Sequence, residues 1–443
     1  MEKKTFKHEM NDLLSAKAHK LIPGGAHTYS KGDDQFPTNA PKIIQRGKGC
    51  RLWDVDGNEF LDLGMSLGTV VLGHAYEPVL EAVRKTIVDG VNFVRPSYLE
   101  GELAELISDV IPSAEMVKFA KNGSDAVTAA VKLARAYTGR DYIARCSSDP
   151  FNAVHDWFIG STVMNRGVPE SVRQLTLQFD YNNLASAERL FDAHPGKIAA
   201  FLLEPISMTV PNPGFLEGLK ALCEKNGALL IFDEVVSGFR FALGGAEEVA
   251  KVTPHLSAWG KAMANGFSVS ALTGIRDVME LGGITHDKGE RVFLLSTTHG
   301  GETHCLAAAL ATINEMREKN IISHFYKTGD RLMNGARKAL AEEKAEHLVN
   351  VFGYGCKPGF AFKDLQGNIC MKSRTLFLHE MVCRGVLMPY VVPSFSHQEK
   401  DIDYAVEAFQ ESVRSLKKNL EDGTIDQTLG GHSVKPVFRK FNK

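Results

Sequence analysis

The sequence of 443 residues lacks several features that mark particular protein classes. It has no run of about 20 apolar residues, and its first residues contain no apolar stretch, so it predicts neither a transmembrane helix nor a signal peptide. It has no internal repeat and no low-complexity segment. Its formal net charge is only −2, which gives no electrostatic reason to expect nucleic acid or a membrane as a partner.

Paired cysteines and metal-ligand spacing are missing too. The seven cysteines are dispersed and contain no Cys-x-x-Cys pair, which indicates reduced thiols in a cytoplasmic protein. His299, His304 and Cys305 lie close in the chain, but no two of them have the spacing that puts metal ligands on one helical face. We therefore expect no metal.

The composition is that of a globular protein larger than one ordinary domain, with 44% apolar and 23% charged residues. Strand and helix patterns alternate through its middle, which predicts an α/β fold with a large, doubly wound, mostly parallel sheet. Amphipathic helices around a short β region follow beyond about residue 318. We expect three segments: 1–60, packing with the small domain; 61–317, the large domain; and 318–443, a smaller α+β domain with a terminal arm on the surface.

Individual elements follow from periodicity and turn residues. Strands are expected at 116–120, 141–145, 197–204 and 227–233, with a hairpin at 51–62 and a β region at 352–362. Helices are expected at 8–21, 77–88, 98–110, 126–135, 215–226, 305–319, 322–345 and 401–420.

Two charged residues stand in unusual surroundings. Asp233 ends a continuous apolar run, so it falls at the carboxyl end of a buried strand, where open α/β sheets place their ligands. Lys261 is flanked by small and apolar residues, where an amine loses its charge more readily and can act as a nucleophile. An ordinary helix cap and a surface lysine remain the alternatives from these two residues alone.

A third feature is the turn Asn122-Gly123-Ser124, which follows a short strand and opens a helix. Such a turn offers backbone N–H groups and a favourable dipole to an anion. An ordinary helix N-cap fits the same residues.

Taken together, ordered motifs over nearly the whole chain resemble the class III pyridoxal-phosphate aminotransferases, and within them the glutamate-1-semialdehyde 2,1-aminomutase branch. The motifs are Ile22–Gly25, Asp54–Gly57, Val71–His74, Asn122–Ala126, Leu133–Asp141, Glu204–Pro205, Pro213–Leu219, Ile231–Val235, Gly238–Arg240 and Gly260–Lys261. The resemblance implies the type I fold of pyridoxal-phosphate enzymes and pyridoxal 5'-phosphate as cofactor.

The resemblance also implies residue roles. Lys261 would hold the cofactor as a Schiff base and shuttle a proton, and Asp233 would keep the pyridine nitrogen protonated. The other implied cofactor-binding residues are Gly123 and Ser124 at the phosphate, Val235 on one ring face, Phe151 as the stacking aromatic, Asn122, Glu204, and Thr298. Thr298 matches a threonine that reaches the phosphate of the neighbouring subunit, which implies a homodimer with shared active sites.

Substrate-handling positions depart from the aminomutase pattern. Thr28 and Lys31 stand where that branch has serine and arginine, and Leu67 stands where it has tryptophan. Lysine does not reproduce the bidentate grip of arginine on a carboxylate. We therefore expect an aminotransferase that takes an amino-acid donor and a different carbonyl acceptor, such as a keto-sugar or another polar ketone or aldehyde. The alternatives are intramolecular transfer by an aminomutase and, more remotely, a non-catalytic homologue.

Overall fold

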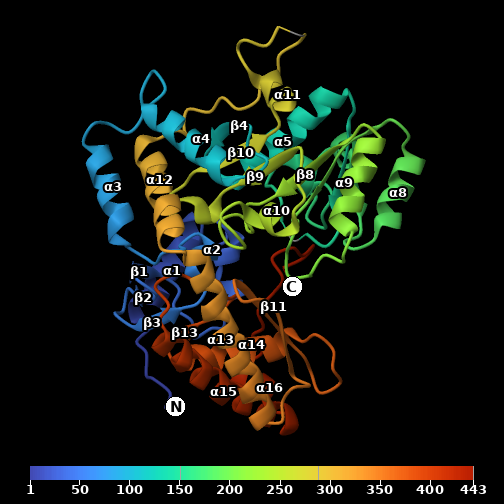
Figure 1. Ribbon diagram of the computed structural model, residues 1–443. Coiled ribbons are helices and arrows are strands. Elements are labelled where there is room, and N and C mark those ends of the chain that lie inside the picture. The colour runs from blue at the N-terminus through green and yellow to red at the C-terminus, as the bar shows by residue number, and fades with distance from the viewer. Residues whose placement is uncertain (150, 288, 443) are drawn as a thin grey trace. The chain divides into compact units, whose positions relative to one another are not determined.

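The computed structural model describes residues 1–149, 151–287 and 289–442, and these fall into two compact units (Figure 1). Unit 1 consists of Met1–Tyr76 and Ser323–Val437. Unit 2 consists of Glu77–Ile322 and the C-terminal residues from Phe438 onward. The sequence-based boundaries at 60 and 317 stay a prediction.

Unit 2 is built on a seven-stranded sheet with the order β4-β10-β9-β8-β7-β5-β6. Its strands are β4 (Met116–Ala120), β5 (Tyr142–Cys146), β6 (Thr176–Phe179), β7 (Ile198–Leu203), β8 (Leu229–Asp233), β9 (Leu256–Trp259) and β10 (Ser270–Gly274). Only β10 is antiparallel to its neighbours β4 and β9, so the other strands all point one way. The predicted α/β fold with a mostly parallel sheet is confirmed.

Helices cover the sheet on both faces, as the strand residues require. Along β8, Leu229 and Ile231 pack in the cluster that includes α5, whereas Leu230 and Phe232 pack in the cluster that includes α8 and α9. Alternate residues of a strand point to opposite faces, so a continuous apolar run needs cover on both sides. The α-helices that lie in unit 2 are α3 (Glu77–Ile87), α4 (Tyr98–Val110), α5 (Gly123–Thr138), α6 (Asp156–Ile159), α7 (Glu170–Arg173), α8 (Leu184–Ala193), α9 (Phe215–Lys225), α10 (Gly245–Ala250), α11 (Arg276–Met279) and α12 (Thr303–Glu318).

Unit 2 differs from the sequence-based expectation in several elements, because β6, β9 and the helices α6, α7, α8, α10 and α11 are not among the expected ones. Helix α5 begins at Gly123 rather than Ala126, because the side chain of Asn122 caps it by accepting a hydrogen bond from Asp125 N–H at 3.3 Å. Strand β10 was not predicted at all. It has five residues, as β4 does, but its sequence Ser-Ala-Leu-Thr-Gly has neither a strict apolar alternation nor a continuous apolar run.

Unit 1 holds a four-stranded sheet of order β1-β2-β3-β13, a separate hairpin and the long C-terminal helices. Its strands are β1 (Ile44–Lys48), β2 (Arg51–Asp54), β3 (Glu59–Asp62), β11 (Val349–Tyr354), β12 (Lys357–Phe362) and β13 (Val386–Leu387). The α-helices are α1 (Glu9–Leu21), α2 (Met65–Gly68), α13 (Ile321–Glu342, most of which belongs to this unit), α14 (Met371–Cys383), α15 (Glu399–Glu421) and α16 (Ile425–Leu429). The predicted hairpin at 51–62 is present as β2 and β3, and the predicted β region near 352–362 is the hairpin of β11 and β12.

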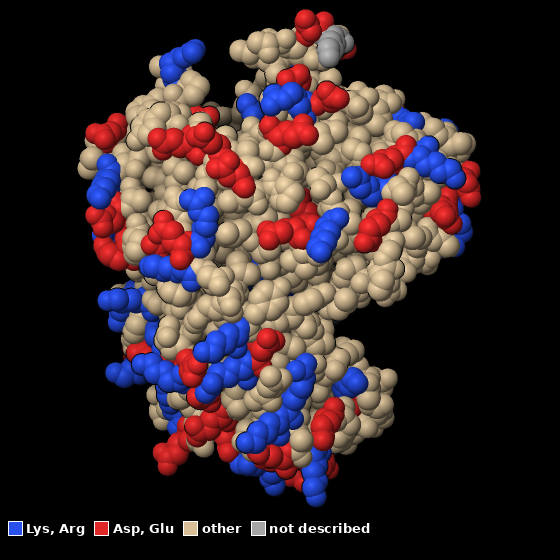
Figure 2. All heavy atoms as spheres, viewed as in Figure 1, with Lys and Arg blue, Asp and Glu red and all other residues tan. Residues whose placement is uncertain are grey.

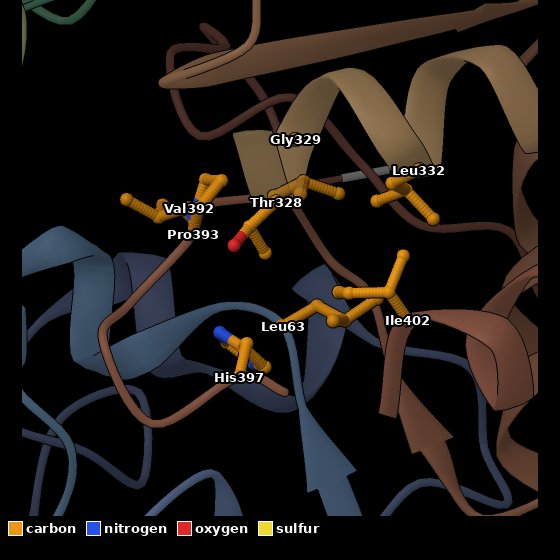
Figure 3. Close-up of a pocket in the computed structure, with 9 residues that line it drawn as sticks. Leu63, Thr328, Gly329, Leu332, Val392, Pro393, His397 and Ile402 are labelled. Atoms are coloured by element: carbon orange, nitrogen blue, oxygen red, sulfur yellow. The ribbon is translucent and has the colours of Figure 1, made fainter. Parts of the chain in front are cut away.

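The core of unit 1 combines an apolar cluster with buried polar residues such as His397. Figure 3 shows Leu63, Leu332 and Ile402 around a small hollow, with His397 at its edge. Both ring nitrogens of His397 are hydrogen-bonded. Nε2 donates to the Asp62 carbonyl at 2.9 Å, and Nδ1 accepts from Ser394 N–H at 3.0 Å. Burial lowers the pKa of His397, which favours the neutral ring that this pattern requires.

The terminal segment after α15 is more than the surface arm that the sequence predicts. It contains α16, and Val434 beyond it is buried, with its N–H bonded to Thr375 Oγ1 at 2.9 Å. Position 443 of the expected arm lies outside the described residues. On the face that Figure 2 shows, acidic and basic side chains are interspersed, in keeping with the net charge of −2.

Candidate active site

The predicted catalytic residues meet at one edge of the unit 2 sheet. Asp233 is the last residue of β8, and Lys261 follows the end of β9 after a single glycine. Because β4, β5, β7, β8 and β9 all point the same way, the segments that leave their carboxyl ends lie at this edge. This is the edge at which open α/β sheets bind ligands.

Asp233 is buried and held by hydrogen bonds from both sides. Its side chain is 5% exposed; Asn152 Nδ2 donates to Oδ2 at 2.9 Å and Val235 N–H donates to Oδ1 at 3.1 Å. Burial raises the pKa of Asp233 to about 6, and the hydrogen bond from Asn152 and the charge of Lys261 oppose that rise. A cation placed against this carboxylate would therefore be strongly favoured.

Lys261 sits at a strained point of the backbone. Its φ is 39°, in the left-handed region that residues with a Cβ seldom adopt, while Ala262, Met263 and Ala264 after it are buried. Strain of this kind persists only where the surrounding structure enforces it, and it is concentrated at functional sites. The packing of the following residues thus fixes the direction in which the Lys261 backbone leaves the sheet.

The N-terminus of α5 supplies an anion-binding position beside these two residues. Asn122 caps the helix, and the first N–H groups of a helix have no intrahelical partner. Ser124 is buried, and its Oγ accepts a hydrogen bond from Val154 N–H at 3.2 Å, which leaves the hydroxyl proton available to an acceptor such as a phosphate oxygen. Helix dipole and donors both favour a negative group here.

Val235 packs between this helix start and the lysine segment. A Cβ added at Gly123 would lie 2.7 Å from both methyl carbons of Val235. A Cβ added at Gly260 would lie 3.6 Å from Val235 Cγ1 and 3.8 Å from the Cα of Gly123. Glycine at 123 is therefore required by close packing, and the anion-binding turn, the valine and the lysine segment are in direct proximity.

The other predicted cofactor residues are placed as follows. Phe151 is 43% exposed and lies one residue before Asn152. Glu204 directly follows β7, is buried, and its N–H donates to Asp149 Oδ2 at 3.0 Å. Thr298 is exposed in a loop, and its backbone carbonyl accepts a hydrogen bond from Asn92 Nδ2 at 3.0 Å.

The loop of Thr298 is tied to the strand that precedes the anion-binding turn. Glu302 accepts hydrogen bonds from Lys121 Nζ at 2.6 Å and from Gly300 N–H at 2.8 Å. Burial alone would raise the pKa of Glu302, but these donors and the charge of Lys121 lower it to about 2. The carboxylate thus stays ionised and anchors the loop.

The three predicted substrate residues lie in unit 1. Thr28 is half-buried at the start of a short 3-10 turn, and Lys31 is exposed at its end. Leu67 belongs to a run of left-handed residues from Met65 to Gly68, which is the same kind of backbone strain that Lys261 shows.

Two buried polar residues at the site were not predicted. Asn152 bonds Asp233 directly, and its Oδ1 is buried without a hydrogen-bond partner among the described residues. Asp149 holds the backbone at Glu204, and burial raises its pKa to about 8. Their signal in the sequence is only that both lie in the loop after β5, a strand whose carboxyl end faces the site.

This set of groups fits a bound pyridoxal phosphate. A buried carboxylate suits its pyridine nitrogen, a helix N-terminus suits its phosphate, an apolar valine suits one ring face, and a lysine suits its aldehyde carbon. The buried, unpartnered Oδ1 of Asn152 is a further polar atom that a bound group can satisfy. Fold and site together define a fold-type I pyridoxal-phosphate enzyme.

The particular family follows from comparison with known proteins. Residues 34–413 match the family Aminotransferase class-III, and the chain belongs to this family. Glutamate-1-semialdehyde 2,1-aminomutase of Syntrophobacter fumaroxidans is 34% identical over 428 residues, covering 90% of this chain and 96% of that protein. The 3-aminobutyryl-CoA aminotransferase of Cloacimonas acidaminovorans is 32% identical over 417 residues, covering 92% and 97%.

A solved structure agrees with both the fold and the cofactor. The FumI protein of Sphingopyxis sp. MTA144, solved with PLP, superimposes with a TM-score of 0.82 at 25% identity, covering 96% of this chain and 98% of that one. The protein is therefore an enzyme that uses pyridoxal phosphate for aminotransferase chemistry, as its sequence predicts. No helix among the described residues is both long and apolar enough to span a membrane.

Proposed function

We propose that Lys261 and Asp233 are the catalytic residues of an intermolecular aminotransferase. One observation carries this proposal: the hydrogen-bonded, buried pair Asn152–Asp233 lies at the same edge of the sheet as Lys261. The positive charge of Lys261 lowers the pKa of Asp233. Lys261 Nζ would take the proton from the substrate carbon that bears the amine and would deliver it to the carbon that entered as the aldehyde of the cofactor, while Asp233 would hold the pyridine nitrogen in its protonated form. When bound, pyridoxal phosphate supplies an electron-withdrawing ring that stabilises the negative charge left on the substrate carbon.

The remaining residues orient the cofactor. The N–H groups of Gly123 and Ser124 and the Ser124 hydroxyl hold the phosphate, Val235 packs on one ring face and Phe151 on the other. Asn122 shapes the phosphate turn as its cap, and Glu204 lines the site from the end of β7. Thr298 completes the phosphate site of a neighbouring subunit.

The substrates we infer are an amino-acid donor and a polar carbonyl acceptor other than glutamate semialdehyde, with a keto-sugar as one example. The support is the set of departures at Thr28, Lys31 and Leu67, because the cofactor positions are kept while these are changed. The single-point charge of Lys31 favours a carbonyl acceptor without a carboxylate that must be gripped by two parallel hydrogen bonds.

An intramolecular aminomutase is the second candidate. It is favoured by the 34% identity to the aminomutase of Syntrophobacter fumaroxidans. The two functions are separated by incubating the purified enzyme with a panel of amino donors and carbonyl acceptors and measuring the keto acid released. A transaminase releases one keto acid per amine transferred. Product from glutamate semialdehyde with no donor and no keto acid would instead establish the mutase.

We further propose that the enzyme is a homodimer with shared sites. Support comes from large apolar side chains that are exposed in unit 2 near the Asn92–Thr298 hydrogen bond: Val88 at 78%, Phe93 at 50%, Val94 at 100% and Tyr98 at 75%. Exposed apolar surface of this kind marks protein–protein interfaces.

Heterodimers test the shared site. A Lys261→Ala chain paired with a Thr298→Ala chain has one site that contains both the lysine and the partner's intact threonine loop. Activity should therefore rise above that of either parent homodimer. A hydroxyl bond to a phosphate contributes about 1.5–3 kcal/mol, so Thr298→Ala alone should weaken cofactor binding roughly ten- to a hundred-fold. Full activity in a chain that sediments as a monomer would contradict the shared site.

A further inference from the structure

The last residues of the chain return to unit 2 and place an aromatic ring against Phe151. The ring centroid of Phe438 lies 6.3 Å from that of Phe151, with the planes inclined by 33°, and 6.3 Å from that of Phe158, at 81°. Phe151 and Phe158 are themselves in contact at 5.7 Å and 78°. The three rings form one cluster, and these separations are those of attractive aromatic pairs.

The residues that follow Phe151 are fixed by hydrogen bonds, but the Phe151 side chain is partly exposed. Asn152 is bonded to Asp233, and Val154 N–H is bonded to Ser124 Oγ. The Phe151 ring is nevertheless 43% exposed. Its rotamer is therefore set by the two rings that touch it, because an exposed side chain without such contacts samples several staggered wells.

The tail is anchored shortly before it reaches this cluster. Val434 N–H donates to Thr375 Oγ1 at 2.9 Å, and Lys435 N–H donates to the Asp34 carbonyl at 2.9 Å. Phe438 follows three residues later and is half-buried against the apolar cluster that contains Ala153 and Trp157.

We infer that Phe438 is a positioning residue that fixes the Phe151 ring in the orientation needed to stack on the cofactor. This inference rests on the proposed role of Phe151. The remaining exposed surface of Phe151 is what a bound ring would cover, while Phe158 and Phe438 support it from the protein side. The C-terminal tail is thereby part of the cofactor site, although it lies more than 170 residues from the nearest catalytic residue in sequence.

The test uses the holoenzyme with Phe438→Ala. We expect weaker visible circular dichroism from the bound cofactor and roughly two- to ten-fold faster cofactor loss on dilution, as expected for one aromatic pair. Phe438→Tyr should restore both signals because it keeps the ring. The matched control is Phe441→Ala, which removes a phenylalanine of the same tail that is 71% exposed and should leave both signals unchanged.

A double variant separates this inference from the proposed function. In a Phe151→Leu background, adding Phe438→Ala should cause no further change in either signal. If Phe151→Leu alone leaves the cofactor signals untouched, the role proposed for Phe151 is wrong. If Phe151→Leu changes them but Phe438→Ala does not, or if the two changes simply add, the inference on Phe438 is overturned while the proposed function stands.

Discussion

Asn152 donates a 2.9 Å hydrogen bond from Nδ2 to Oδ2 of Asp233, and both side chains are buried. The bond links the loop after β5 to the end of β8, so the carboxylate is fixed by an element that is distant in sequence. It also favours the ionised acid against the cost of burial. The state of Asp233 therefore depends on a residue outside its own strand.

Asn152→Ala should raise the pKa of Asp233, because it removes a hydrogen bond that now lowers it. The acid limb of the profile of kcat/KM against pH should then move to higher pH, since a larger fraction of Asp233 is protonated at any given pH. The lost bond to a charged group is worth about 1.5–3 kcal/mol, so the rate at a pH near the limb should fall roughly ten- to a hundred-fold. Asn350→Ala, at an exposed position of β11, is the control and should not move the profile.

Lys261→Ala should abolish turnover, because no other group is proposed to move the substrate proton. Reduction with borohydride followed by peptide mass spectrometry should find the cofactor attached to the peptide that holds Lys261 in the wild type and to no peptide in the variant. The variant should still bind the cofactor through the helix start at Gly123. Transamination at a near wild-type rate in Lys261→Ala would show that the assignment is wrong.

Gly123→Ala should weaken cofactor binding. The new methyl group would lie 2.7 Å from the Val235 methyl carbons, so either the start of α5 or Val235 must move. We expect a loss of about 1–3 kcal/mol, typical of overpacking, measured as faster cofactor loss from the holoenzyme. Adding Val235→Ala should recover part of this loss by making room. If the double variant is as impaired as the sum of the singles, the contact with Val235 is not the cause.

Asp149→Asn should stabilise the protein relative to wild type, and increasingly so as the pH rises. Burial raises the pKa of Asp149 from 3.8 to about 8, so the folded state binds a proton that the unfolded state has released. Wild-type stability is therefore lost as pH rises from about 4 through 8, and the amide variant avoids this loss while it keeps an acceptor for Glu204 N–H. The measurement is the difference in Tm between the two proteins at pH 5 and pH 8.

A difference in Tm between the two proteins that stays constant with pH, or that narrows toward pH 8, would mean that Asp149 is ionised in the folded protein. Glu217→Gln is the matched control, because it makes the same kind of change from acid to amide at an exposed position of α9.

Local sequence preferences account for most of the strands and helices and for the chemical types of the residues at the site. The all-apolar run before Asp233 requires a strand covered on both faces, and Asn122 with Gly123 and Ser124 requires a helix start, because these preferences act between near neighbours. The family motifs then predicted the cofactor, which the comparisons support, and a role for Lys261, which stays a prediction. Helix α5 extends three residues beyond the expected range at each end, and at its start this is because the side chain of Asn122 caps it.

Which of these segments lie against one another depends on the folded arrangement of the whole chain. Gly123 follows β4 and Val235 follows β8, and two other strands, β10 and β9, lie between these strands in the sheet. The two residues are nevertheless in close contact in the folded chain. Asn152 became a partner of Asp233, and Phe438 a support for Phe151, only because strand order and chain return placed them there. Such pairings depend on loop closure across tens to hundreds of residues, and no local preference encodes them.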